Sequence, residues 1–202
     1  MQNRSFGHLK FLTPLAIAVA VLASTQPGRA QTVRGRASAM TTTISTLFGS
    51  TSVALADTGV LTDPTDAREA SKGSGAVSSL VTGDALHATT IGWPDQVASE
   101  SSVADVAVSI AGNAIGADFV MSRARAVQGA SASGATDVQG LSVNGVAIPV
   151  TGAPNQTVWI AGGRIVINEQ QISATGATVN ALHVVVAGVA DIVIASATAD
   201  VR

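Results

Sequence analysis

The densest cluster of polar side chains in this chain of 202 residues lies at positions 168–171, where the sequence reads Asn-Glu-Gln-Gln. The apolar residues before it predict a strand. In one interpretation, Glu169 contacts a ligand or acts as a general acid or base. In the other, Asn168, Glu169 and Gln170 cap the edge of a sheet and satisfy nearby backbone groups with side-chain hydrogen bonds. We expect the structural role.

His183 lies midway along the next predicted strand and is the residue that could extend this cluster. A turn at Thr175-Gly176 predicts that His183 faces Asn168, and a loop one residue different in length predicts that it faces Glu169. A Glu–His pair is a fragment of a metal or proton-transfer site. His87 lies on a separate predicted strand, so we expect neither a metal site nor a catalytic set. The candidate polar cluster consists of Asn168, Glu169, Gln170 and His183.

Other residue patterns that support catalysis are not found in the sequence. No serine lies in a Gly-x-Ser-x-Gly elbow, and no phosphate-binding glycine loop precedes a helix. Asp57, Asp63 and Asp66 lack the regularly spaced oxygen ligands of a calcium loop, so we interpret them as solvated charges. Trp93 and Trp159 each lie beside a predicted turn and are expected to cover the ends of a sheet. We expect a protein that is not an enzyme and carries no cofactor.

Turn signals separate short apolar runs throughout the last third of the chain. Asn144-Gly145 lies between alternating apolar residues, which is the strongest short-range signal for a hairpin with a type I′ turn. Similar turns are predicted at 161–163, 175–176 and 187–188, which together indicate an antiparallel meander. We therefore predict an all-β fold of about ten strands, packed as a two-sheet sandwich or a flattened barrel. A β-solenoid is the alternative, although no repeat of fixed length supports it.

The region before this meander is divided into two parts. Residues 31–76 are predicted to contain one or two strands, followed by a turn at 63–66 and a charged, solvated loop at 68–75. A short helix over 64–71 is the alternative for this segment. Residues 77–202 are predicted to form the main antiparallel domain, and 31–202 together form one domain. Residues 129–136 are small and polar, which indicates a mobile loop.

The first 30 residues have the features of a secretory signal peptide. Arg4 and Lys10 precede an apolar run at 11–23, and Gly28-Arg29-Ala30 ends in the small residue that a signal peptidase requires. The run is well short of the roughly 20 residues that a membrane span needs. We expect cleavage before Gln31 and no membrane span in the mature chain.

Composition restricts the possible partners. The formal net charge is −2, and it becomes more negative when Arg4, Lys10 and Arg29 are removed with the signal peptide. Such a chain has no basic surface for nucleic acid or an anionic membrane. Cysteine is absent, which excludes disulfides and thiolate metal sites. Aromatic residues make up 3% and tyrosine is absent, which disfavours a carbohydrate-binding surface.

Six blocks of the chain together carry a family resemblance: 101–106, 141–145 (Leu-Ser-Val-Asn-Gly), 153–158, 167–170 (Ile-Asn-Glu-Gln), 179–184 (Val-Asn-Ala-Leu-His-Val) and 190–196. In these blocks the chain resembles the bacterial choice-of-anchor P family of exported surface proteins. The resemblance covers residues 76–202 and extends more weakly over 37–75. It implies an exported domain from a family whose members carry different C-terminal anchoring signals, and it implies no particular activity. No sorting motif follows the last predicted strand, so we expect release or non-covalent retention at the surface.

These observations predict a secreted, non-enzymatic structural or adhesion protein of the bacterial cell surface or extracellular matrix. The alternative is a small-ligand or metal-binding β module that uses the region of Glu169 and His183. The expected partners of the protein are other extracellular or cell-envelope components and a second copy of the chain. The run 191–201 alternates in polarity, with 193, 195, 197, 199 and 201 on one face, and has no Lys or Pro. We predict weak self-association through this run as an edge strand; alternatively, it is central and paired on both sides.

Overall fold

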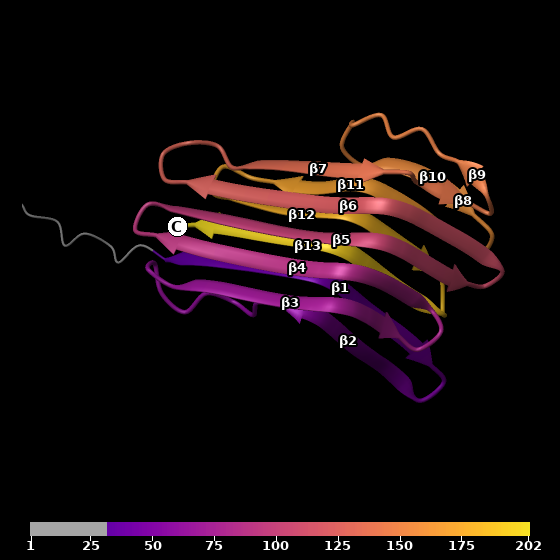
Figure 1. Cartoon of the computed structure of the whole chain (residues 1–202). Helices are drawn as coiled ribbons and strands as arrows, with labels where there is room; N and C mark the ends of the chain where they lie inside the picture. The colour runs from indigo at the N-terminus through magenta and orange to yellow at the C-terminus, as the bar shows by residue number, and fades with distance from the viewer. Residues whose placement is uncertain (1–31) are drawn as a thin grey trace, which may run out of the picture. The chain divides into compact units, whose positions relative to one another are not determined.

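The computed structural model describes residues 32–202, so the predicted signal peptide lies outside the described residues. The described chain is all-β and contains two antiparallel sheets that pack face to face (Figure 1). The prediction of a two-sheet sandwich is thus confirmed, and neither a closed barrel nor a solenoid is present in this part of the chain. Residues 32–202 contain no helix that is long and apolar enough to cross a membrane.

The first sheet, sheet A, joins the C-terminal meander to the N-terminal hairpin. In order across the sheet its strands are β10 (Gln156–Ile160), β11 (Gly163–Ile172), β12 (Gly176–Val186), β13 (Ala190–Val201), β1 (Val33–Thr46) and β2 (Gly49–Asp57). The pairing of β13 with β1 connects the two ends of the described chain, and Thr32 and Arg202 exchange backbone hydrogen bonds beside it. The N-terminal segment is therefore an integral part of the sheet.

The second sheet, sheet B, is formed by the middle of the chain. In order its strands are β3 (Ala67–Val77), β4 (Val81–Trp93), β5 (Gln96–Ile110), β6 (Asn113–Val127), β8 (Ser142–Val143) and β9 (Val146–Ala147), and β7 (Ser133–Gln139) also pairs with β6. Asn144 and Gly145 between β8 and β9 have φ values of 51° and 77°, which are the positive values of a type I′ turn. The hairpin that Asn-Gly predicts is therefore present.

Three predictions from the sequence need correction. The charged segment 68–75 is neither a loop nor a helix but most of strand β3, whose charged side chains are tolerated because β3 is an exposed sheet edge. The predicted loop at 129–136 ends early, because β7 begins at Ser133. The run 191–201 is not an edge strand: as β13 it pairs with β12 on one side and β1 on the other. Its backbone groups are thus already used, and self-association through it is excluded.

A row of unusual backbone conformations crosses sheet A. Ala56, Ala195 and Asn168 have φ values of 47°, 53° and 53° on β2, β13 and β11, and the residues between them in the row are Ala39 on β1 and Ala181 on β12. Positive φ reverses the face that the next side chain occupies, and it is disfavoured for residues other than glycine. Four of the five residues are alanine, whose small side chain suits this crowded row.

The consequence is visible along β13. Ile194 and Ala195 are both fully buried, although they are neighbours in the strand. Before Ala195 the even-numbered residues face the core, and after it the odd-numbered ones do. The alternation predicted for the whole run 191–201 is therefore correct only from Ala195 onward.

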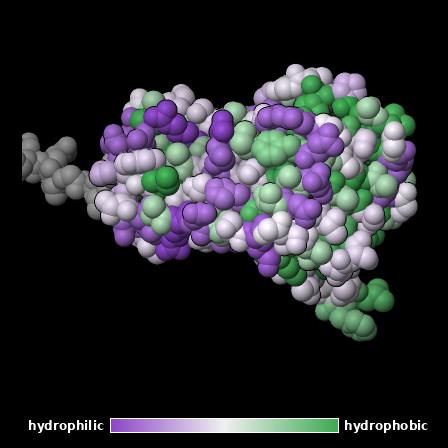
Figure 2. All heavy atoms as spheres, in the orientation of Figure 1, coloured by the Kyte–Doolittle hydropathy of each residue, from purple (hydrophilic) through white to green (hydrophobic). Residues whose placement is uncertain are grey.

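The core has a different composition at the two ends of the sandwich. At the end that contains the turns 47–48, 111–112, 161–162 and 187–189, hereafter the hairpin end, large aliphatic side chains fill it. At the end that contains Thr32 and Arg202, hereafter the terminal end, alanine dominates. There Ser99 and Ser101 of β5 donate hydrogen bonds of 2.7 and 3.0 Å to the carbonyl oxygens of Thr198 and Ser196 in the other sheet. These bonds require closely spaced sheets. In Figure 2, hydrophilic atoms gather toward the terminal end of the visible face and apolar atoms toward the hairpin end.

Candidate functional site

The candidate polar cluster lies in sheet A, but the structure divides it between two locations. Asn168 is buried, and its amide donates to the carbonyl oxygen of Gly152 at 2.9 Å. Gln170 donates to Asn168 Oδ1 at 2.6 Å, and its backbone N–H donates to Asn155 Oδ1 at 2.9 Å. Asn168 and Gln170 therefore hold the loop before β10 against β11. This part of the cluster stabilises the fold.

Glu169 lies on the other face of β11 and joins a network across three strands. Its Oε2 accepts a hydrogen bond of 2.6 Å from Asn180 Nδ2 and lies 2.9 Å from His183 Nδ1, both on β12. His183 Nε2 in turn lies 3.0 Å from Asp191 Oδ1 on β13. Ser196 extends the network, because its hydroxyl donates to Asn180 Oδ1 at 2.7 Å. We call Glu169, Asn180, His183, Asp191 and Ser196 the outer-face network.

The strand register explains how these side chains meet. Val166, rather than Asn168 or Glu169, lies opposite His183, so the predicted pairing is wrong by two or three residues. The reason is that the hairpin closes through Ser173 and Gly176 rather than about Thr175-Gly176, with a bond of 2.8 Å from Ser173 N to Gly176 O. The imidazole reaches Glu169 diagonally, which long side chains on adjacent strands can do.

The imidazole of His183 lies between two carboxylates. A neutral imidazole has one N–H and can donate to only one of them, whereas the imidazolium donates to both. The side chains of His183 and Glu169 retain exposures of 17% and 23%, so both are largely shielded from solvent. With both ring nitrogens facing carboxylates, His183 is not placed to activate a serine hydroxyl. Within the outer-face network, these side chains therefore link β11, β12 and β13 to one another by hydrogen bonds.

Metal ligation is the second activity that these residue types suggest. Among residues 32–202, no group of three or more His, Cys, Asp or Glu side chains is arranged to hold a metal ion. His87 lies on β4 in the other sheet, where its Nε2 is 3.4 Å from Glu69 Oε1. The two histidines are thus on different sheets and do not form one site.

A shallow depression adjoins the outer-face network on sheet A. It has a volume of about 230 Å³, and its lining residues are Arg36, Ser38, Thr41, Asn180, Val193, Ser196 and Thr198. The Arg36 guanidinium pairs with Asp57, which raises the pKa of Arg36 and lowers that of Asp57. Asn180 and Ser196 bond to each other. The depression offers hydroxyl and amide groups for a small polar ligand.

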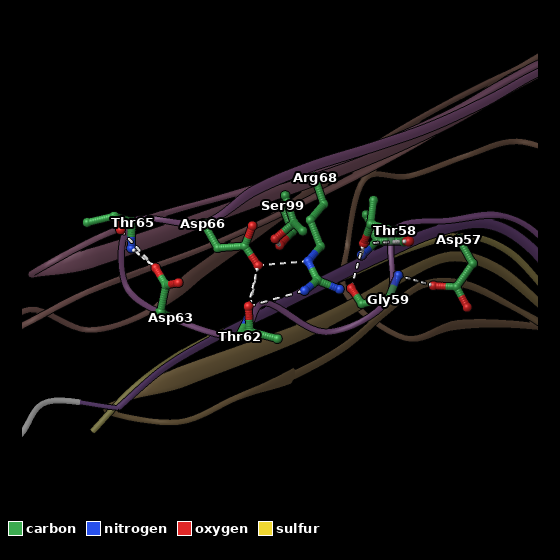
Figure 3. A network of polar contacts seen from close by, with 11 residues as sticks. Asp57, Thr58, Gly59, Thr62, Asp63, Thr65, Asp66, Arg68 and Ser99 are labelled. Carbon is green, nitrogen blue, oxygen red and sulfur yellow. Dashed lines mark hydrogen bonds and ion pairs between the residues drawn. The ribbon is translucent and has the colours of Figure 1, made fainter.

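The three aspartates of the 57–66 segment have defined structural roles (Figure 3). Asp63 Oδ1 accepts hydrogen bonds of 2.8 Å from the backbone N–H and the hydroxyl of Thr65. Asp66 Oδ2 accepts from Thr62 N at 3.0 Å, Thr62 Oγ1 at 2.9 Å and Arg68 Nε at 2.8 Å. Our interpretation of these residues as simply solvated charges is therefore incomplete, because they order the connection between the two sheets.

These contacts change the acidity of Asp66. The backbone N–H of Thr62, followed by the Arg68 side chain and the Thr62 hydroxyl, favours the charged form and lowers the pKa of Asp66 from 3.8 to about 2. In Figure 3 the side chains of Thr62, Asp66 and Arg68 point toward one another, whereas Asp57 lies apart from them. The aspartates therefore do not converge on one point, as cation ligands would.

Two tryptophans and three network members differ from the sequence-based expectations. Trp159 on β10 is 77% exposed, so it does not cover the end of the sheet, and Trp93 is 38% exposed.

Asn180, Asp191 and Ser196 were not predicted as site residues. The hairpin about Ala187-Gly188 pairs Asp191 with Val185, two residues from His183, so the two side chains can meet diagonally. The position of this turn in the sequence is therefore the signal from which the contact could have been predicted.

The fold and the outer-face network define a two-sheet antiparallel β-sandwich whose densest polar cluster is internally hydrogen-bonded. No family model, curated protein or solved structure matches the chain.

Proposed function

We propose that the protein is an exported, non-enzymatic structural or adhesion protein of the bacterial cell surface or extracellular matrix. The observation that carries the proposal is the state of the outer-face network. Glu169, Asn180 and His183 each have partners on a neighbouring strand, so the polar residues most suited to chemistry are used to join strands. The resemblance to exported surface proteins and the signal-peptide features of the first 30 residues support the same role.

Export is tested by expressing the full chain in a secreting bacterial host. We expect the protein in the medium or the surface fraction, with an N-terminus at Gln31 as determined by mass spectrometry of the intact product. Protein that remains in the cytoplasm with Met1 or Gln2 at its N-terminus would contradict the proposal. A cytoplasmic reporter protein expressed in the same cells serves as the control for lysis.

A second function, binding of a small polar ligand, is favoured by the depression beside Asn180 and Ser196. The two functions are distinguished by one variant at Glu169 and one at Ser196. If the network is structural, Glu169→Ala lowers the melting temperature and affects nothing else. If it serves a ligand site, Ser196→Ala leaves the fold intact and abolishes the thermal stabilisation produced by a bound compound from a library of sugars and amino acids. Absence of any stabilising compound would contradict the second function.

A further inference from the structure

The strands at the sheet edges differ in how well they are protected against pairing with another chain. β3, at one edge of sheet B, carries Arg68, Glu69 and Lys72, and β10, at one edge of sheet A, is only five residues long. β2, at the other edge of sheet A, has nine residues, and its only charged residue is Asp57 at the end, which pairs with Arg36. Charges, prolines and short length are the usual protection of edge strands. β2 has none of these devices along residues 49–56.

The free side of β2 is accessible in the described part of the molecule. No strand within residues 32–202 pairs with β2 on the side away from β1, as Figure 1 shows. Residues 49–52 are exposed, and Val53 and Leu55 face the core but are only partly buried. Every second residue of such an edge directs its backbone N–H and C=O groups outward. β2 therefore combines unpaired backbone groups with incompletely covered apolar side chains.

Exposed apolar side chains lie beyond both ends of the same strand. Leu47 and Phe48 form the turn before β2 and are 99% and 100% exposed, and Val60 follows β2 and is 48% exposed. Figure 2 shows apolar atoms projecting from the surface where Figure 1 places the turn between β1 and β2. Two adjacent large apolar residues that are completely exposed at the tip of a hairpin indicate a contact surface.

We propose that β2 pairs antiparallel with β2 of a second copy of this chain, around a two-fold axis near Val53. In such a pairing opposite residues lie on the same face of the sheet. Val53 then lies opposite Val53 of the second copy, and Leu55 lies opposite Thr51, so the incompletely covered core side chains meet. The two copies of sheet A become one continuous sheet.

The arrangement of apolar residues favours a second copy over an unrelated partner. Antiparallel pairing brings the start of β2 in one copy beside the end of β2 in the other. The exposed Leu47 and Phe48 therefore lie near the segment that contains Val60 of the second copy, and the same contact forms twice. Such self-complementarity is what a two-fold interface requires. Residues 41–56 carry no charge, so the net negative charge of the chain does not place like charges along this edge.

This inference concerns contacts between copies and goes beyond the proposed location of the protein. It would supply the lateral contact that a surface or matrix protein uses to assemble. A protein that is exported but strictly monomeric would contradict the pairing and leave the proposed location intact. A protein that is not exported but pairs through β2 would contradict the proposed location and leave the pairing intact. The two proposals can therefore be rejected independently.

Disulfide trapping tests the pairing directly, because the natural chain contains no cysteine. In the exported protein, Val53→Cys places one thiol beside the two-fold axis, where opposite Cβ atoms of paired strands are roughly 4.5–5.5 Å apart. We expect a covalent dimer under mild oxidation. The matched control is Ala70→Cys, at a partly buried, core-facing position of edge strand β3. Equal cross-linking of the two variants would overturn the proposal.

Association without a cross-link is measured by size-exclusion chromatography with light scattering across a concentration series. We expect the natural sequence to dimerise and the double variant Leu47→Ser/Phe48→Ser to dimerise at least tenfold more weakly. Because both side chains are almost completely exposed, the melting temperature of the double variant should stay within a few degrees of the natural value. A natural protein that remains monomeric at every concentration, or a double variant that dimerises equally well, would overturn the proposal.

Discussion

Asn113 and Ala161 connect the two sheets through a pair of reciprocal hydrogen bonds. Asn113 begins β6 in sheet B, and Ala161 lies in the turn between β10 and β11 in sheet A. The Asn113 side chain donates to the Ala161 carbonyl oxygen at 3.0 Å and accepts from the Ala161 N–H at 3.2 Å. Asn113 is 3% exposed. Its amide bonds to both the N–H and the C=O of Ala161, as the backbone of a neighbouring strand would.

Replacement of Asn113 should therefore be costly. In Asn113→Ala both backbone groups of Ala161 lose their partner, and we expect a loss of about 2 kcal/mol in the free energy of unfolding. Equilibrium unfolding in urea measures this change. Gln139→Ala, which removes an exposed amide bonded only to Asp137, is the control and should change stability by less than about 0.5 kcal/mol. Similar values for the two variants would show that the bridge between the sheets contributes little.

Close approach of the sheets at the terminal end predicts a strong effect at Gly35. A Cβ atom at this position would lie 2.7 Å from Val97 Cγ1 and would also meet the Thr90 hydroxyl. Gly35→Ala should therefore lower the free energy of unfolding by about 2 kcal/mol, the usual range for an overpacked core.

Gly73 on β3 is the matched control, because a Cβ atom there would meet nothing within 4 Å and its φ lies outside the left-handed region. Gly73→Ala should be neutral or stabilising by about 0.5 kcal/mol, since alanine restricts the unfolded chain. Thermal unfolding of both variants is the measurement. A Gly35→Ala protein as stable as Gly73→Ala would mean that the sheets are further apart than the structure shows.

Asp66 should make the fold sensitive to acid. Its pKa is lowered to about 2 from an ordinary value of 3.8, so its contribution to stability is complete above the ordinary value and is lost as pH falls toward 2. We expect the natural protein to melt higher than Asp66→Asn at neutral pH, with the difference shrinking between pH 4 and pH 2. Melting curves across this range measure it. A difference that is constant with pH would contradict the assignment.

The outer-face network should contribute modestly to stability. Glu169→Gln keeps the size of the side chain but removes the charge that faces His183 and Asn180. We expect a loss of about 1 kcal/mol, because the side chains of His183 and Glu169 retain exposures of 17% and 23%, so that solvent still weakens their interaction. His183→Gln should cause a similar loss, and the double variant should lose less than the sum of the two. Additive losses in a double-mutant cycle would show that Glu169 and His183 do not interact.

Local chemistry determined much of the fold. Asn144-Gly145 predicts a hairpin because both residues accept positive φ, and in the turns at 161–162 and 187–188 the glycine alone has a positive φ. Alternating apolar residues between these turns predict strands with one face in a core. These signals lie within a few residues of one another, so the sequence alone is sufficient to predict an all-β antiparallel fold, whereas the choice of a two-sheet sandwich over a flattened barrel comes from the structure.

The candidate site was only partly predictable. Glu169 and His183 were expected to lie on neighbouring strands, and they do, but their contact is diagonal and includes Asp191 from a third strand. A change of register by one residue moves every side chain to the other face. The turn between β11 and β12 is centred one residue earlier than expected, which changes the register of the two strands by two residues. This small difference decides which side chains meet.

The sequence by itself determined most of the strands and the position of most turns, because these depend on backbone preferences and on polarity patterns of neighbouring residues. Only the tertiary structure decided that β13 is central and β2 is an edge, since this depends on pairing between β1 and β13, at opposite ends of the described chain. It also decided the change of face at Ala195, which has a positive φ and lies in the row of residues that crosses sheet A. Long-range strand pairing and packing between sheets leave no local signal in the sequence, and they determine which surfaces of this protein are free to act.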